Sequence, residues 1–239
     1  MARFKDKRAV VTGGTRGIGL AIATSLISEG ARVVAVSRTE QLDGSVERFE
    51  HFQADVTNAD DIRQLKAYVA ALGGVDFLIH SAGITDSRPF ASLPEAAWLN
   101  VIAVNLSGVM RVTQALLPSV RKSSQGRIIS IGSVAGMRAN VGQAVYGASK
   151  AGLIHFMKVL ALEEARKGIT CNVICPGFID TDMTESLREA IKEKALAQIP
   201  QHRFGKPENV ASLVLWLCSK EAAYVTGAVF AIDGGLSVA

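Results

Sequence analysis

The sequence has 239 residues, of which 49% are hydrophobic, so one α/β domain can bury a large core. Lysine and arginine (26) exceed aspartate and glutamate (22) only slightly, and the surplus is spread along the chain, which argues against a nucleic-acid partner. The start, MARFKDKRAVV, lacks the apolar stretch of a signal peptide, and we find no run of about 18 apolar residues, so a cytoplasmic protein without a membrane span is expected.

Short apolar, β-branched runs alternate with segments that carry apolar residues at helical spacing. The predicted strands are 8–12, 31–37, 51–55, 76–82, 127–133, 170–177 and 228–233. The predicted helices are 18–29, 59–72, 95–120, 146–167 and 207–219. This alternation predicts a Rossmann-type, doubly wound α/β fold: seven mainly parallel strands with helices on both faces. No repeat or linker divides the chain, so residues 1–239 are expected to form a single domain.

A glycine-rich turn follows the first predicted strand, in TGGTRGIGLAIATSLISEG. Gly13, Gly17 and Gly19 would let the backbone approach a diphosphate, which the free N–H groups of the next helix would bind. The spacing is G-x-x-x-G-x-G and not the common G-x-G-x-x-G, and a purely structural turn is the alternative. The position between the first strand and the first helix favours a dinucleotide site.

The end of the second predicted strand indicates which dinucleotide binds. It reads Ser37-Arg38, without the acidic residue that would bind a ribose 2′-hydroxyl and repel a 2′-phosphate. Arg38 can meet a phosphate, and Arg16 in the glycine turn lies on the same side of the expected site. We therefore expect NADP(H), with solvated surface arginines as the alternative.

The connection to the third strand, RTEQLDGSVERFE at 38–50, is close to the minimum length for a crossover, so at most one short helix is expected there. Asp55, which ends the third strand, is expected to bind the adenine amino group. The alternative is that Asp55, Thr57 or Asn58 caps the following helix.

Tyr146 and Lys150, in AVYGASKAGL, stand one helical turn apart and therefore share one face of a helix. An ammonium near a phenol lowers the phenol pKa toward the range in which a proton can pass to a substrate oxygen. Ser133 ends the strand RIISIGS at the edge where open α/β sheets place their ligands. Tyr146 is thus a candidate general acid. For the pair alone, the alternative is an exposed contact that contributes about 0.3 kcal/mol.

Together these motifs resemble the short-chain dehydrogenase/reductase family over essentially the whole chain. The matching segments are TGGTRGIG, HSAG at 80–83, VNLSG at 104–108, SIGSVAG at 130–136, YGASK at 146–150 and CPGFIDTDM at 175–183. Within the family, the chain is most similar to the branch that reduces 3-oxoacyl groups on acyl carrier protein.

The resemblance implies a catalytic tetrad of Asn105, Ser133, Tyr146 and Lys150. Tyr146 would give a proton to a carbonyl oxygen that Ser133 holds by a hydrogen bond. Lys150 would lower the tyrosine pKa and bind the nicotinamide ribose. Asn105 would hold a water that links Lys150 to solvent, or else be a buried amide satisfied by helix backbone.

The resemblance also implies where the cofactor binds. Pro176 and Gly177 would shape the turn around the nicotinamide, and Ile179 and Thr181 would touch its carboxamide end. The segment at about 181–200 would form a lid whose ordering depends on the ligand. The complete expected set is Gly13, Thr15, Arg16, Gly17, Ile18, Gly19, Ser37, Arg38, Asp55, Val56, Ser81, Ala82, Gly83, Tyr146, Lys150, Pro176, Gly177, Ile179 and Thr181.

One motif departs from the family pattern, which usually has Asn-Asn-Ala-Gly where this chain has residues 80–83. Ser81 lacks the reach of an amide, and His80, inside an apolar strand, is expected to be a core histidine with satisfied hydrogen bonds. Cys171, Cys175 and Cys218 form no cluster with histidines, so reduced core thiols and no metal site are expected.

The implied function is NADPH-dependent reduction of 3-oxoacyl thioesters to 3-hydroxyacyl thioesters in fatty-acid or related biosynthesis, by a homotetramer that binds acyl carrier protein. A basic patch beside the active-site mouth would bind the acidic carrier, or else serve solubility only: Arg121, Lys122, Arg127, Arg166 and Lys167. The alternatives are another carbonyl substrate (acetoacetyl-CoA, a quinone or a cyclic ketone), oxidation of a secondary alcohol, and a non-catalytic nucleotide-binding scaffold. Acyl-chain length, carrier and product stereochemistry stay open.

Overall fold

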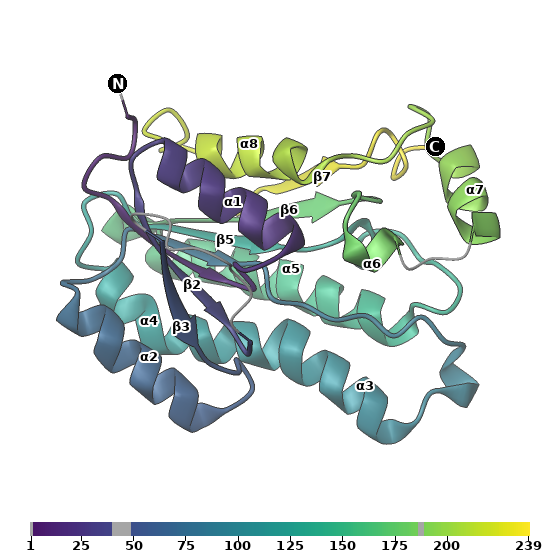
Figure 1. Cartoon of the computed structure of the whole chain (residues 1–239), viewed down its shortest axis with the longest axis horizontal. Helices are drawn as coiled ribbons and strands as arrows, with labels where there is room; N and C mark the ends of the chain where they lie inside the picture. Colours follow the sequence, from purple (N-terminus) through teal and green to yellow (C-terminus); the bar gives the residue numbers. More distant parts are fainter. Residues whose placement is uncertain (1, 40–48, 186–188) are drawn as a thin grey trace.

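The computed structural model describes residues 2–39, 49–185 and 189–239, and its strands form one seven-stranded sheet (Figure 1). The strand order is β3-β2-β1-β4-β5-β6-β7, and every pairing is parallel. The strands are β1 (Arg8–Thr12), β2 (Arg32–Ser37), β3 (Phe49–Gln53), β4 (Phe77–His80), β5 (Arg127–Ile131), β6 (Thr170–Pro176) and β7 (Val229–Ile232). The predicted doubly wound sheet is therefore confirmed. The prediction for the connection between β2 and β3 concerns mainly residues 40–48, which lie outside the described residues.

Helices cover both faces of the sheet, with α1 and α8 on one face and α2, α4 and α5 on the other (Figure 1). Alternate strand residues serve the two faces, because Val10 packs with the second group of helices while Ala9 and Val11 pack with the first. The helices are α1 (Gly17–Ser28), α2 (Ala59–Ala71), α3 (Glu95–Ile102), α4 (Val109–Val120), α5 (Ala144–Glu164), α6 (Asp182–Glu185), α7 (Glu189–Gln198) and α8 (Pro207–Cys218). Short 3-10 turns occur at Phe90–Ser92, Val134–Gly136 and Ala165–Lys167.

The predicted helix 95–120 is continuous but irregular in its middle. A π-helical segment, Ala103–Gly108, joins α3 to α4. The helix approaches the loop after β3 closely, since a Cβ added to Gly108 would lie 2.9 Å from Val56 Cγ2. Single π turns inside helices frequently occur at functional positions, and Asn105 lies in this one.

Within the described residues, this helix is the one that is long and apolar enough to cross a membrane by length and composition alone, although it holds no run of about 18 apolar residues. Glu95–Val120 passes that test by length and composition, with a mean hydropathy of 1.3 over an 18-residue window of which 39% is buried inside the protein. A core helix passes the same test. Val109, Val112 and Leu116 of this segment belong to the largest apolar cluster of the fold, as expected for a core helix.

The carboxyl ends of the parallel strands meet at one edge of the sheet, where the motifs identified in the sequence emerge. The glycine turn follows β1, HSAG overlaps the end of β4, Ser133 follows β5, and CPGFIDTDM begins at the end of β6. The segment assigned as a lid, about 181–200, contains α6 and α7, which the sequence analysis did not predict, and residues 186–188 of it lie outside the described part of the chain.

Candidate active site

The glycine turn is folded so tightly that side chains cannot replace its hydrogens. Gly13 and Gly17 have positive φ angles of 67° and 50°. A Cβ on Gly19 would collide with the Gly13 carbonyl oxygen, and a Cβ on Gly13 would lie 2.8 Å from the backbone nitrogen of Ala82. The turn therefore packs against itself and against the end of β4.

The N-terminus of α1 has no side-chain cap, because Arg16, the residue before it, makes no capping hydrogen bond. The first N–H groups of a helix lack partners within the helix and favour an anion. Thr15 is buried, Ile18 is half-buried, and Arg16 is exposed. The end of α1 without a cap from Arg16 therefore lies at the predicted diphosphate position, and anion binding there stays a prediction.

At the ends of β2 and β3, backbone contacts fix the residues that were predicted to select the cofactor. The Ser37 hydroxyl donates to Thr39 O at 2.7 Å and lies 2.9 Å from His51 Nε2. The carbonyl of Arg38 accepts from Gln53 Nε2 at 2.9 Å, while Arg38 itself is exposed. The hydrogen bond to Gln53 therefore fixes the backbone at Arg38, and Arg38 lies at the surface.

Hydrogen bonds before α2 show which residue caps this helix, the alternative to adenine binding for Asp55. Asn58 caps α2, since its side chain accepts from the N–H groups of Asp60 and Asp61 at 2.8 and 3.4 Å. Asp55 accepts from the N–H and the hydroxyl of Thr57 at 2.8 and 2.7 Å. Asp55 therefore shapes the turn before the helix and does not cap it, and its role toward adenine stays a prediction.

The end of β4 connects the glycine turn to the predicted tetrad. The N–H of Ser81 donates to Thr12 O at 3.1 Å, and Ala82 lies against Gly13. A Cβ on Gly83 would lie 3.4 Å from Asn105 Oδ1 and 3.6 Å from Lys150 Nζ. One short segment therefore touches both halves of the site.

The four tetrad residues come together at this edge. Lys150 is buried, donates from Nζ to Ile131 O at 2.8 Å, and lies 5.8 Å from the centre of the Tyr146 ring. The side chain of Ser133 lies beside the Tyr146 hydroxyl, close enough to lower the pKa of that phenol. This places a serine, a tyrosine and a lysine around one position, as the spacing predicted.

Asn105 is fully buried and bonds outside its own helix. Its Oδ1 accepts from the N–H of Ile84 at 2.9 Å, and its Nδ2 donates to Ile84 O at 2.9 Å and to Ser149 Oγ at 3.1 Å. The alternative of an amide satisfied by helix backbone is therefore wrong, because the backbone partner belongs to the loop after β4.

The pKa values of the pair differ from the sequence prediction. Burial lowers the pKa of Lys150 to about 8. Burial also raises the pKa of Tyr146, and the hydrogen bond from Ser133 opposes that rise without cancelling it. Lys150 does not lower the pKa of Tyr146 as predicted, because burial of the phenol has the largest effect on that pKa and raises it. Tyr146 is accordingly a neutral phenol at pH 7, able to donate a proton.

The sequence analysis missed two residues of this site. The hydroxyl of Ser149 donates to Tyr146 O at 2.7 Å and accepts from Asn105, so it joins the tetrad's helix to its amide. The thiol of Cys175 is buried, which raises its pKa, and the Ser133 backbone and Lys150 lie close enough to oppose that rise. The position of Ser149 within the motif YGASK could have indicated a site residue. For Cys175, the only such indication in the sequence is its position next to Pro176.

The segment after β6 completes the site. The N–H of Gly177 donates to Ile232 O at 2.9 Å, and buried Ile179 forms a bridge with Gly205. A Cβ on Gly17 would lie 3.5 Å from Thr181 Cγ2, so Thr181 lies over the glycine turn. Pro176, Gly177, Ile179 and Thr181 thus lie at the carboxyl edge, with Thr181 against the predicted diphosphate site.

The predicted basic patch is wrong for a single chain. Arg127 is buried and donates to the carbonyls of Gly126 and Ser219 at 2.9 and 3.3 Å, because it begins β5 beneath the end of α8. Arg121 and Lys167 both pair with the buried carboxylate of Glu164. Arg121, Lys122 and Arg127 lie at or before the start of β5. Arg166 and Lys167 follow the end of α5, about 30 Å along that helix from Tyr146.

His80 is a core residue, as predicted, but it is only partly satisfied. Its Nε2 lies 2.9 Å from Thr113 Oγ1, while Nδ1 has no hydrogen-bond partner among the described residues. Burial lowers the pKa of His80 to about 3, so the ring stays neutral in the folded protein at ordinary pH. The His80 ring contacts Thr113 of α4 in the core, so we assign it no catalytic role.

Acid is expected to destabilise the protein through His80. The unfolded chain takes up the proton near pH 6.5 whereas the folded chain does not until about pH 3, so stability is complete above pH 6.5 and falls as the pH drops below it. The loss attributable to His80 is about 2 kcal/mol between pH 7 and pH 5. Urea unfolding at pH 7 and pH 5 measures the loss of unfolding free energy between them, and His80→Asn should lose about 2 kcal/mol less than the wild type. The exposed-site control His155→Asn should behave like the wild type.

The comparisons with known proteins agree with this geometry. The chain belongs to the short-chain dehydrogenase/reductase family, whose model described as enoyl-(acyl carrier protein) reductase matches residues 13–237. It is 41% identical to the 3-oxoacyl-[acyl-carrier-protein] reductase FabG of Vibrio cholerae over 98% of both chains, and 42% identical to nodulation protein G of Rhizobium sp. strain N33 over 100% of both. The ligand-free aldohexose dehydrogenase of Thermoplasma acidophilum has a TM-score of 0.90 and 31% identity, covering 100% of this chain and 96% of that one.

Proposed function

We propose that this protein is an NADPH-dependent reductase that converts 3-oxoacyl thioesters on acyl carrier protein into 3-hydroxyacyl thioesters, in fatty-acid or related biosynthesis. The observation that carries the proposal is the meeting of Ser133, Tyr146 and Lys150 beside a glycine turn that excludes side chains. The choice of a 3-oxoacyl substrate is supported by relatives such as the Vibrio cholerae reductase.

The residues present fit a nicotinamide dinucleotide phosphate. The turn at Gly13 and Gly19 leaves no room for a Cβ, and the uncapped N–H groups of α1 would hold the diphosphate. Arg38 and Arg16, both exposed, would bind the 2′-phosphate, and β2 ends in Ser37 without a carboxylate to repel it. When bound, the reduced nicotinamide supplies a hydride for a carbonyl carbon.

The side chains at the site would stabilise the charge that develops on the substrate. The hydroxyls of Ser133 and Tyr146 would donate hydrogen bonds to the carbonyl oxygen, whose negative charge grows during reduction. Tyr146, whose pKa is raised by burial, would then give up its proton as the general acid. Lys150, which donates to Ile131 O, would turn its remaining hydrogens toward the cofactor ribose.

Asn105 would connect this site with solvent. Three of its four hydrogen-bonding positions are used by Ile84 and Ser149, which leaves one lone pair of Oδ1 beside Lys150 and Gly83. A water on that lone pair would return a proton toward Tyr146 by way of Lys150.

We further propose that residues 1–239 act as one domain within a cytoplasmic homotetramer. Large exposed apolar side chains on the helices and beside β7 support an assembly, among them Leu162 at 80% exposure and Tyr224 beyond the end of α8. Sedimentation or light scattering of the purified chain would measure the number of subunits.

A panel of substrates tests the function. NADPH oxidation would be followed with 3-oxoacyl groups on acyl carrier protein and on coenzyme A, and with a quinone, a cyclic ketone and an aldohexose lactone. The highest kcat/KM is expected for the carrier-bound thioesters. A higher value for a non-thioester carbonyl would contradict the proposal, and NADPH binding without turnover on any substrate would indicate a scaffold.

Arg38→Asp is expected to weaken NADPH binding by at least about tenfold more than NADH binding, because the new carboxylate repels a 2′-phosphate and accepts from a 2′-hydroxyl. Fluorescence titration with both nucleotides measures the ratio. Arg32→Asp is the matched control, since Arg32 is exposed at the opposite end of the same strand and should leave the ratio unchanged. Equal losses of NADPH and NADH in Arg38→Asp would remove the argument for NADP(H).

A further inference from the structure

A small apolar cluster, separate from the two main cores, lies directly behind the candidate site. Its buried members are Val134, Ile199 and Leu236, with exposures of 6%, 1% and 3%, and Phe178 and Phe204 pack against them. Each comes from a different functional segment: Val134 follows Ser133, Phe178 lies between Gly177 and Ile179, and Ile199 follows α7. The cluster therefore joins the Ser133 loop, the proposed nicotinamide segment and the end of the lid.

Leu236 reaches the cluster from the turn after β7, which has a defined shape. The Asp233 carboxylate accepts from the N–H groups of Gly235 and Ser237 at 3.0 and 2.8 Å. Gly234 and Gly235 have φ angles of 64° and 95°, and a Cβ on either would lie within 3.0 Å of Ile199 or Pro200. The turn after β7 is thus built to hold Leu236 at one position against the end of the lid.

The Ser133 loop is joined to Leu236 in two ways. The side chains of Val134 and Leu236 belong to the same cluster, and Arg138 Nη1 donates to Leu236 O at 2.6 Å. The backbone N–H of Arg138 in turn donates to Val134 O at 2.8 Å. Val134, Arg138 and Leu236 therefore each contact the other two, and Val134 is the residue next to Ser133 in the chain.

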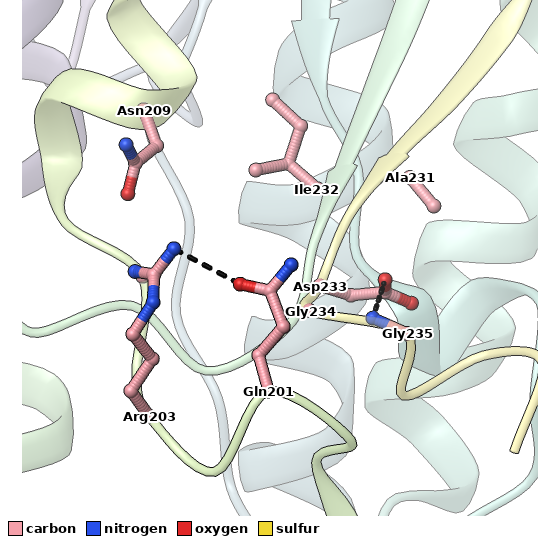
Figure 2. Close-up of a pocket in the computed structure, with 9 residues that line it drawn as sticks. Gln201, Arg203, Asn209, Ala231, Ile232, Asp233, Gly234 and Gly235 are labelled. Atoms are coloured by element: carbon pink, nitrogen blue, oxygen red, sulfur yellow. Dashed lines mark hydrogen bonds between the residues drawn. The ribbon is translucent and has the colours of Figure 1, made fainter.

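The turn after β7 also borders a cavity of about 360 Å³, lined by residues that include Gln201, Arg203 and Asp233 (Figure 2). In the figure, the Asp233 carboxylate closes the turn onto Gly235 while Arg203 and Gln201 bond each other across the opening. The N–H of Gln201 donates to Gly234 O at 3.1 Å on the cavity side, while Leu236 and Arg138 hold the end of the turn to the Ser133 loop.

We propose that Leu236 is a positioning residue: with Arg138 it holds the Ser133 loop and the end of the lid in the arrangement that the proposed reductase reaction needs. The inference rests on the proposed function for its kinetic consequences. Ser133 must donate to the carbonyl oxygen from its place beside Tyr146, and small displacements of such a group lower turnover steeply. Loss of Leu236 contacts would loosen Val134 and therefore Ser133.

The test compares Leu236→Ala with Leu236→Met, which keeps the volume, and with Val238→Ala, which changes a side chain at 88% exposure two residues away. Leu236→Ala is expected to lower kcat at least about tenfold, with the NADPH dissociation constant within about threefold of wild type. Leu236→Met and Val238→Ala are expected to retain wild-type kcat.

A second readout does not depend on the substrate. Hydrogen exchange should accelerate in Leu236→Ala at the amides of Ala135, Gly136 and Arg138, which bond to Ser133 and Val134. If Leu236→Ala does not fold, Arg138→Ala removes the bond to Leu236 O without a core cavity and is expected to give the same kinetic and exchange changes. A folded variant with wild-type kcat and wild-type exchange would overturn the proposal. Wild-type enzyme inactive on every 3-oxoacyl thioester would refute the proposed function alone, since the exchange result still decides the role of Leu236.

Discussion

Tyr146→Phe is expected to lower kcat for carbonyl reduction by at least about 100-fold and to leave NADPH affinity nearly unchanged. The phenol hydroxyl lies beside Ser133, and its raised pKa keeps it protonated at neutral pH. Its removal takes away the proposed proton donor and one of the two proposed donors to the carbonyl oxygen. The ring itself still fills its half-buried position in α5. Steady-state rates and fluorescence titration with NADPH measure the two quantities.

Tyr224→Phe is the matched control, because Tyr224 is fully exposed and removal of its hydroxyl should change neither quantity. Full activity in Tyr146→Phe would show that another group donates the proton. A parallel loss of NADPH binding would show that the substitution disturbs the cofactor site and not the chemistry.

Lys150→Met is expected to lower kcat/KM for NADPH by at least about 100-fold, because the amine is proposed to hold the cofactor ribose and to pass protons toward Tyr146. The ammonium is present below the Lys150 pKa of about 8 and is lost as the pH rises through it. The wild-type kcat/KM for NADPH should therefore decline above pH 8, and the residual activity of the variant should lack that decline.

Lys158→Met, two turns further along α5 at an exposed position, is the control and should keep both the rate and the alkaline decline. An unchanged pH profile in Lys150→Met would mean that the decline belongs to a different group. The proposed ribose contact would then lack support, whatever the size of the rate loss.

Local sequence patterns were sufficient for the strands and for the glycine turn. The β-branched run at 8–12 and the glycines at 13, 17 and 19 need no distant partner to be recognised, and the structure places them as predicted. The convergence of Ser133 with Tyr146 followed from topology, because parallel strands end at one edge and the next helix begins there.

Features that depend on burial were not predictable. The charge of Arg127 suggested a surface patch, but the strand register and the end of α8 cover it. The Tyr146 and Lys150 spacing indicated attraction between the two groups, but burial in the folded protein dominates both pKa values. His80 was placed in the core by its apolar strand, yet its partner Thr113 lies 33 residues later.

The π-helical segment Ala103–Gly108 also escaped prediction, because apolar spacing in 95–120 is compatible with a regular helix. Its consequence is a phase shift along the chain: the wider turn rotates the residues before it relative to those after it. A one-residue deletion that restored ideal winding would swing Asn105 by about 100° and detach it from Ile84. The irregular winding is therefore what lets one helix serve the sheet with its second half while aiming an amide at the site.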